Sequence, residues 1–360
     1  MRIAVYNQHF RTLGGGERRS LALAAHLARD HEVTVISEAP VPAELLNRLF
    51  GIEPGALHWL ADPNWGLDGR PTERFDVFIN NSHASALKNP GRFGIYMCMF
   101  PEADRPDLSS YHVITANSAF TAHWIARKWG LKSRVVYSAC QDMGPPAVKR
   151  NIILNVGRFF APDGRNHHKH QRALLQSFLA MRRAGLEDWD LHLVGNCGAG
   201  EDDLAFLADL RREAEGHPVR IETGLEFEVL RQRYRQAALY WHATGYNVDE
   251  DKQPSAHEHL GMAVIEAMSA GAVPLAIRGG GPREVIRDGV DGHLWSSADE
   301  LQEKSWRLIR PGIDGAIGFA PWMPRMARQA VSRARQFALP AFLAAMDAII
   351  AEAAQSAEPV

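Results

Sequence analysis

The sequence predicts an α/β protein with two parallel sheets, because short apolar runs alternate with helical patterns along most of the chain. Its 360 residues correspond to about two domains at roughly 150 residues each. Near residues 141–146 the alternation stops, since Pro145 and Pro146 after Gly144 cannot continue a helix or a central strand. Two facing Rossmann-like domains, one on each side of this linker, are therefore expected.

The elements of the first half follow from its apolar periodicity. A strand is expected at residues 3–6, then a glycine-rich loop at residues 14–16 and a helix with Leu21 and Leu27 on its apolar face. The other expected elements of this half are a helix over residues 120–129 and strands at 33–36, 76–79, 95–99, 112–115 and 135–137.

The same pattern starts again after the linker. Strands are expected at residues 152–156, 191–194, 219–221, 239–241 and 272–277. Helices are expected between them at residues 173–183, 203–215, 227–238 and 262–270, and further helical patterns at 298–309 and 324–355.

Composition limits the function classes. The net charge of −2 gives no general basic surface, so nucleic acid is not an expected partner. The three cysteines, Cys98, Cys140 and Cys197, are far apart and indicate a reducing compartment rather than a disulfide or zinc site. The chain opens on a strand pattern without a signal segment, and no apolar run approaches 18 residues or so. A soluble, cytoplasmic protein is expected.

The glycine-rich loop is a candidate phosphate site. Glycines between a strand and a helix let backbone N–H groups approach a phosphate at the positive end of the helix. A flexible turn would have the same composition. A dinucleotide fingerprint is a third interpretation, with Glu38 on a ribose, but Arg19 stands where its third glycine would be.

Two cations follow the first strand of the second half. Arg158 comes directly after Gly157, and Lys169 precedes the next helix. Cations near the carboxyl end of a parallel strand suit a diphosphate, although solvated surface positions would have the same spacing. His167, His168 and His170 surround Lys169, but no carboxylate or cysteine lies at ligand spacing, which favours a loop over a metal site.

Two glutamates eight residues apart are the strongest candidates for ligand-binding residues. Glu258 lies in a polar loop with His259, and Glu266 lies in the helix that starts near Gly261. The backbone N–H groups of Leu260, Gly261 and Met262 would point at the same ligand. One carboxylate could bind sugar hydroxyls and the other a ribose diol. Surface carboxylates at this spacing also arise by chance.

The motifs together resemble one enzyme family. They comprise residues 14–18, 117–121, 156–158 with Lys169, 258–268, and 280–289. With them, the sequence resembles the retaining glycosyltransferases of family 4, which have the GT-B architecture. Residues 333–337 with Phe342 resemble the family's C-terminal helix, which crosses back onto the first domain. The resemblance implies an acceptor domain at residues 1–145, a nucleotide-sugar donor domain at 146–325, and C-terminal helices at 326–360.

The resemblance also implies roles for the candidates. Arg158 and Lys169 would bind the donor diphosphate, which Gly15 and Gly16 would cap from the other domain. Glu258 would orient the donor sugar and Glu266 the ribose, so Glu258, Lys169 and Arg158 would be the catalytic group. His259, Leu260, Gly261 and Met262 would complete the donor site. No metal or other cofactor is expected.

The sequence departs from the family at one position. Related enzymes often carry a histidine before an aromatic residue and a proline in the first domain, where this chain has Met99 before Phe100 and Pro101. Either His83 or Glu102 takes over on the acceptor side, or the loop aligns differently.

Two further segments have both a functional and a purely structural interpretation, and we prefer the structural one for each. Residues 249–251 resemble a metal-binding D-x-D triplet but are expected to form a solvated acidic loop. Residues 123–134 mix basic and aromatic side chains, which suits either a membrane surface or a helix whose tryptophans pack inward.

The resemblance implies transfer of a hexosyl group from a GDP- or UDP-sugar to a hydroxyl of a saccharide or lipid-linked acceptor, in surface polysaccharide or glycoconjugate synthesis. The enzyme would be cytoplasmic or peripheral at the inner face of a membrane. The alternatives are a GT-B nucleotide-sugar-binding protein without transfer activity, a GT-B sugar-nucleotide epimerase or phosphorylase-like enzyme, and an NAD-dependent dehydrogenase.

Overall fold

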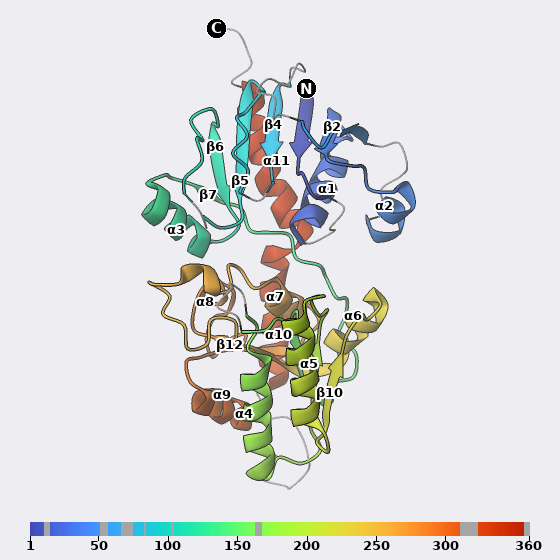
Figure 1. Ribbon diagram of the computed structural model, residues 1–360, viewed down its shortest axis with the longest axis vertical. Helices are drawn as coiled ribbons and strands as arrows, with labels where there is room; N and C mark the ends of the chain where they lie inside the picture. Colours follow the sequence, from blue (N-terminus) through green and yellow to red (C-terminus); the bar gives the residue numbers. More distant parts are fainter. Residues whose placement is uncertain are drawn as a thin grey trace. The chain divides into compact units, whose positions relative to one another are not determined.

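The computed structural model describes residues 1–10, 15–50, 57–65, 75–82, 84–101, 104–162, 168–309 and 323–355 (Figure 1). It divides the chain into two compact units. The first comprises Met1–Ala139 with Leu339–Val360, and the second comprises Cys140–Ala338. The first unit is therefore interrupted after Ala139, and the second unit ends at Ala338. The sequence analysis placed these two boundaries at residues 145 and 325 instead.

The first unit is built on a seven-stranded sheet in which every described pair of strands is parallel. The strand order is β3-β2-β1-β4-β5-β6-β7. The strands are β1 (Arg2–Tyr6), β2 (Glu32–Ser37), β3 (His58–Ala61), β4 (Val77–Asn80), β5 (Phe93–Cys98), β6 (Val113–Ala116) and β7 (Arg134–Val135). The central strands β4 and β5 are buried along their whole length, which explains their nearly continuous apolar sequences.

The helices of the first unit come from both ends of the chain. They are α1 (Gly15–Leu27), α2 (Ala43–Phe50), α3 (Ala119–Trp129) and α11 (Leu339–Gln355). Helix α11 buries Phe342, Met346 and Ile349 in the same apolar cluster as strand β1, and it lies behind the sheet in Figure 1. The predicted helical segment 324–355 is therefore divided, because its first helix packs in the second unit and its last in the first.

Helix α3 shows how its mixed basic and aromatic sequence is used. The Ser118 hydroxyl caps the helix by accepting a hydrogen bond from the Thr121 N–H at 3.0 Å. Trp124 and Trp129 are buried, and the Arg127 guanidinium lies over the Trp124 ring at 4.9 Å from its centroid. The tryptophans therefore pack inward, as one of the two interpretations expected.

The second unit has a six-stranded sheet, again parallel throughout its described pairs, in the order β10-β9-β8-β11-β12-β13. Its strands are β8 (Arg150–Val156), β9 (Asp190–Val194), β10 (Val219–Glu222), β11 (Ala237–His242), β12 (Val273–Ile277) and β13 (His293–Trp295). Its helices are α4 (Gln171–Arg183), α5 (Glu201–Ala214), α6 (Phe227–Gln236), α7 (Met262–Ser269), α8 (Pro282–Val285), α9 (Ala298–Ile309) and α10 (Met323–Ala334), with short 3₁₀ turns at Pro254–Ala256 and Arg335–Phe337.

The structure differs from the sequence prediction at the glycine-rich segment, and it contains three elements that were not predicted. Gly15 and Gly16 begin helix α1 rather than forming a loop before it, and Gly14 lies outside the described residues. Strand β3, helix α2 and strand β13 were not expected from the sequence. Strand β3 is the edge strand of the sheet, where a short half-exposed strand has little apolar alternation to reveal it.

No helix among the described residues has both the length and the hydropathy needed to cross a bilayer.

Candidate functional site

The candidate site lies where the strand order of the second sheet reverses. From β8 the chain adds β9 and β10 on one side, and it then returns to add β11, β12 and β13 on the other. In open parallel sheets, ligands bind outside the carboxyl ends of the strands at this reversal. The residues that follow β8 and β11 therefore lie where a ligand is expected to bind.

Three side chains meet there. The Lys169 ammonium donates to Oε2 of Glu258 at 2.8 Å, and Nε2 of His242 lies 3.4 Å from the same oxygen. His242 ends strand β11, and Lys169 lies just before helix α4. Lys169 and Glu258 are each about one-fifth exposed, whereas His242 is buried. The sequence predicted Lys169 and Glu258 for one ligand, and the structure brings them into direct contact.

The charges of this group are well defined. Burial acts to raise the pKa of Glu258, but the Lys169 ammonium and the His242 ring outweigh it and hold that pKa well below its ordinary value. Burial lowers the pKa of His242, so its imidazole is neutral and shares one N–H with the carboxylate. The group is thus an ion pair with a neutral hydrogen-bond donor beside it.

Only one oxygen of Glu258 is occupied. Both donors converge on Oε2, and Oε1 accepts no hydrogen bond from any residue that the structure describes. A carboxylate oxygen has room for two hydrogen bonds. Oε1 can therefore accept hydroxyl groups from a ligand while Oε2 stays on the protein.

The backbone of Glu258 is fixed by the glycine-rich turn after β12. The Gly281 N–H donates to the Glu258 carbonyl oxygen at 2.7 Å. A Cβ atom on Gly280, whose φ is +60°, would lie 2.3 Å from the same oxygen, so a larger residue would displace Glu258. This close approach explains why residue 280 is a glycine.

Helix α7 starts four residues after Glu258. Its N-cap, Gly261, has a φ of +100° and no side-chain hydrogen bond to the first turn. The first N–H groups of a helix have no partners within the helix, so an end without a side-chain cap favours an anion. His259, Leu260, Gly261 and Met262 lead into this end, as the sequence predicted.

Glu266 lies one turn into helix α7 and is held by a residue that the sequence did not indicate. The phenol of Tyr234 in helix α6 donates to Oε2 of Glu266 at 2.9 Å. Burial raises the pKa of Tyr234 well above its ordinary value, so the phenol keeps its proton.

The Arg158 side chain is more exposed than that of Lys169 and lies against an aromatic ring. It follows strand β8 and is exposed, and its guanidinium lies over the Phe160 ring at 4.7 Å from the centroid. The Gln171 side chain donates to the carbonyl oxygens of Gly157 and Arg158, which fixes the turn between them. The backbone of Arg158 is therefore placed, whereas its cation faces solvent.

The first unit has its own buried polar group at the corresponding reversal, between β1 and β4. Asn81, directly after β4, donates to the Gly16 carbonyl oxygen at 3.2 Å and to the Ser20 hydroxyl at 2.5 Å. Its Oδ1 accepts from the buried Arg19 guanidinium at 2.6 Å, and Arg19 also donates to the Ser138 hydroxyl. Asn81 thus fixes the start of helix α1. The sequence did not single it out, because it lies in a run of polar residues after strand β4.

Met99 lies beside this group. Its sulfur accepts from the Arg19 guanidinium at 3.3 Å, and its methyl carbon would lie 3.7 Å from a Cβ atom on Gly16. The position where the family resemblance led us to expect a histidine is therefore a thioether in contact with a buried guanidinium. His83 and Glu102, the acceptor-side candidates, and His167 lie outside the described residues.

The acidic segment 249–251 is only partly solvated. Glu250 accepts from the Gly280 N–H at 2.9 Å and pairs with Arg283 at 2.5 Å, so it fixes the glycine-rich turn. Asp249 remains half exposed and pairs with Lys252. Among the residues that the structure describes, no group of three or more histidine, cysteine or acidic side chains could hold a metal ion.

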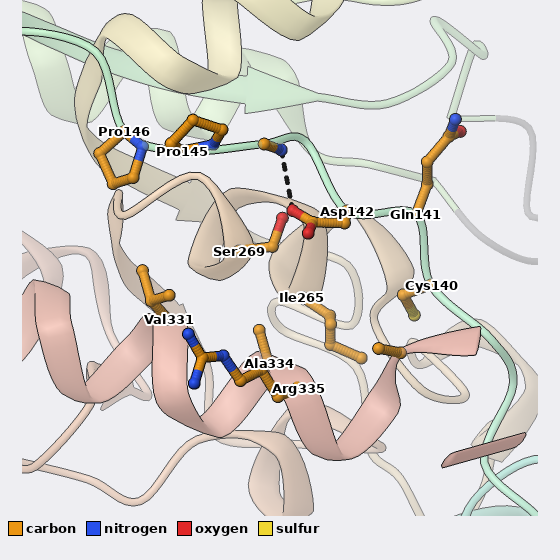
Figure 2. Close-up of a pocket in the computed structure, with 12 residues that line it drawn as sticks. Cys140, Gln141, Asp142, Pro145, Pro146, Ile265, Ser269, Val331, Ala334 and Arg335 are labelled. Atoms are coloured by element: carbon orange, nitrogen blue, oxygen red, sulfur yellow. Dashed lines mark hydrogen bonds between the residues drawn. The ribbon is translucent and has the colours of Figure 1, made fainter. Parts of the chain in front are cut away.

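A cavity of about 320 Å³ lies on another side of helix α7 (Figure 2). Ile265 and Ser269 of α7 line it, together with the segment 140–146 and the end of helix α10. The Ser269 hydroxyl accepts from the Met143 N–H at 3.0 Å, which ties this segment to the helix.

Comparison with known proteins finds a family match over most of the second unit. Residues 143–310 match the family model described as "Glycosyl transferases group 1". The matched segment includes Arg158, Lys169, Glu258 and Glu266. This part of the second unit therefore has the sequence features of a group 1 glycosyltransferase domain.

The curated relatives cover part of the chain. The GDP-Man:Man(3)GlcNAc(2)-PP-Dol alpha-1,2-mannosyltransferase of Xenopus laevis is 30% identical over 185 residues, which are 48% of this chain and 35% of that protein. The human protein of the same name is 27% identical over 239 residues, which are 61% of this chain and 45% of that protein. The chain thus spans less than half the length of these relatives.

Solved structures match nearly the whole chain. HepE of Anabaena in complex with UDP and glucose superposes with a TM-score of 0.70 at 14% identity, over 98% of this chain and 100% of that one. Sucrose-phosphate synthase from Thermosynechococcus elongatus gives 0.68 at 14% identity, over 99% and 100%. With the two parallel-sheet units, these matches show the GT-B architecture that the sequence predicted.

Proposed function

We propose that the chain is a retaining glycosyltransferase of family 4 that moves a hexosyl group from a nucleotide-diphosphate sugar to a hydroxyl group. The observation that carries this proposal is the contact of Lys169 with Glu258, which leaves one carboxylate oxygen open. This contact lies at the reversal of the strand order, four residues before a helix without a side-chain cap. A cation, an open carboxylate and free helix amides are the groups that a sugar diphosphate needs.

In the proposed mechanism the acceptor hydroxyl attacks from the face that the diphosphate leaves. A leaving-group oxygen takes the hydroxyl proton, so no dedicated protein base is required. Lys169, Arg158 and the first amides of helix α7 stabilise the charge that grows on the diphosphate, which is usually the largest catalytic term. These groups take the place that a metal ion has in other transferases. Glu258 orients the transferred sugar through Oε1, and Glu266 binds the ribose.

For the donor we propose a GDP- or UDP-sugar. The curated relatives are named for GDP-mannose, and the HepE structures contain UDP with glucose. For the acceptor we propose a saccharide or a lipid-linked saccharide, because the names of the mannosyltransferases include a lipid-linked one. A cytoplasmic enzyme at the surface of a membrane, active in polysaccharide or glycoconjugate synthesis, would use such an acceptor.

A second candidate is a GT-B protein that binds nucleotide sugars without transfer. Met99, in place of the usual histidine and in contact with Arg19, favours it. This candidate predicts donor binding without release of nucleoside diphosphate, whatever acceptor is supplied.

Turnover of defined donors tests the proposal. Release of nucleoside diphosphate from GDP-mannose and UDP-glucose would be followed for the wild type, Glu258→Gln and the control Glu303→Gln, whose carboxylate is 60% exposed in a surface ion pair. We expect Glu258→Gln to lower kcat by about a hundredfold or more, and the control to match the wild type. Proton NMR of the first product should show retained anomeric configuration. Equal turnover in Glu258→Gln, or an inverted product, would refute the proposal.

A further inference from the structure

His242 is a buried histidine with an incomplete set of hydrogen bonds. It ends strand β11, where its backbone pairs in register with Ala276 of strand β12, and the residue is 4% exposed. Nε2 faces the Glu258 carboxylate, so this nitrogen carries the ring proton. Nδ1 has no hydrogen-bond partner among the described residues.

An unsatisfied nitrogen in the interior destabilises a fold, and such groups call for an explanation. An apolar ring of similar shape would fill the same space without this penalty. Packing therefore does not account for a histidine at residue 242, whereas the contact with Glu258 does. Functional sites are where such local costs are retained.

The second observation is the distribution of donors on Glu258. Both Lys169 and His242 reach Oε2. When a donor diphosphate binds, its oxygens compete for the Lys169 ammonium. The ring of His242 cannot move toward the diphosphate in the same way, because it is buried at the end of the strand. His242 then remains on Oε2 and keeps Oε1 directed toward the ligand. Its separation of 3.4 Å is long for a hydrogen bond, and such contacts often shorten in the substrate complex.

We propose that His242 is a positioning residue, which fixes the Glu258 carboxylate through Oε2 so that Oε1 meets the transferred sugar. This inference rests on the proposed function, in which Glu258 orients the donor sugar. It assigns His242 no contact with the nucleotide.

Two substitutions separate positioning from packing. His242→Phe keeps the ring and removes the N–H, whereas His242→Gln places an amide N–H near the position of Nε2. The exposed His217→Gln serves as the matched control. Calorimetry would give the Kd of UDP and GDP, and release of nucleoside diphosphate from UDP-glucose and GDP-mannose would give kcat/KM. Thermal unfolding would be recorded for each variant.

For His242→Phe we expect donor kcat/KM to fall about tenfold, the Kd of the nucleotide to change less than twofold, and Tm not to fall. His242→Gln should recover most of the lost turnover, since it restores a donor to Oε2. Unchanged turnover in His242→Phe would overturn the inference. So would a parallel loss of nucleotide affinity, turnover and Tm that His242→Gln does not repair. If the wild type itself releases no nucleoside diphosphate from any sugar nucleotide, the proposed function fails instead.

Discussion

At the scale of single residues, the candidate site contains an ion pair between Lys169 and Glu258, and a bound diphosphate would compete with Glu258 for the ammonium group. Lys169 and Glu258 neutralise each other at 2.8 Å while both remain partly exposed. A diphosphate brings more negative charge than one carboxylate, so it can draw the ammonium away and release Glu258 for the sugar. In the proposed donor complex, the same two side chains would bind two different parts of the donor.

Lys169 should matter chiefly in the transition state, where charge on the diphosphate grows. We expect Lys169→Ala to lower kcat at saturating donor by about 10²–10³-fold. Lys252→Ala is the matched control, because Lys252 is 81% exposed and pairs with Asp249 at the surface. Steady-state kinetics of donor turnover measure both. Near-normal turnover of Lys169→Ala would show that its ammonium does not stabilise the leaving group.

Asn81 should matter for stability, because it accepts from the buried Arg19 guanidinium. Asn81→Ala removes that acceptor and the bond to the Gly16 carbonyl oxygen. A cost of about 2–4 kcal/mol in the free energy of unfolding is expected. Urea titration would measure it, with the exposed Asn64→Ala as control. Equal stability of the two variants would contradict this role.

At the scale of elements, short turns at the strand ends do the positioning. The turn at residues 279–281 fixes the backbone of Glu258, and Glu250 fixes that turn. The next turn, at residues 286–292, is organised by Asp288, which accepts from the Leu294 N–H at 3.1 Å and from Arg278 at 2.6 Å. Carboxylates thus hold both turns that follow strand β12.

Asp288 gives a pH-dependent test. Burial acts to raise the pKa of Asp288, but its hydrogen bonds and the Lys304 and Arg278 cations lower it to about 2. Because the folded pKa is depressed, the carboxylate stabilises the fold above its unfolded pKa of about 4, and this contribution is lost as the pH falls through about 2. We expect Asp288→Asn to destabilise by about 1–2 kcal/mol at pH 7. The difference from the wild type in urea unfolding should shrink between pH 4 and pH 2. A difference that does not vary with pH would exclude the charge as its source.

The elements show what the sequence could and could not predict. Long periodic segments such as α4 and the central strands β8 and β11 were predicted to within two residues or so at each end, because burial imposes their apolar spacing. Lys169, Glu258 and Glu266 were recognisable from spacing around strand and helix ends. His242, Tyr234 and Asn81 were not, because each acts through a partner distant in sequence. Only the register between strands and helices brings these pairs together.

At the scale of the whole molecule, the chain leaves the first unit at Ala139 and re-enters it at Leu339. Helix α11 then fills the core of that unit with Phe342, Met346 and Ile350. The first unit therefore depends on residues at both ends of the sequence, whereas the second is continuous.

Removal of residues 339–360 should unfold the first unit selectively. The loss of several fully buried apolar side chains, at about 2–5 kcal/mol each for large-to-small changes, exceeds the stability of a typical domain. We expect calorimetry of the shortened chain to show one transition, that of the second unit, and hydrogen exchange to show loss of protection in strands β1 and β4. A shortened chain that unfolds like the full one would show that α11 is dispensable.

Metal removal tests the proposed electrostatics. Because Lys169, Arg158 and the α7 amides are proposed to neutralise the diphosphate, we expect donor turnover to be unchanged by EDTA and not to rise with added Mg²⁺ or Mn²⁺. Turnover that disappears on chelation and returns with one of these ions would show that a cation shares this task.

Ligand-induced stabilisation would show whether the protein binds a nucleotide sugar and whether Glu266 contributes to that binding. Thermal unfolding of the wild type and Glu266→Ala would be measured with UDP-, GDP- and ADP-sugars and with NAD. A ligand at 100 times its Kd adds about 2.7 kcal/mol of stability. We expect one nucleotide sugar to stabilise the wild type and to stabilise Glu266→Ala much less. Stabilisation by NAD alone would contradict the transferase and would make the glycines at residues 14–16 part of a dinucleotide site.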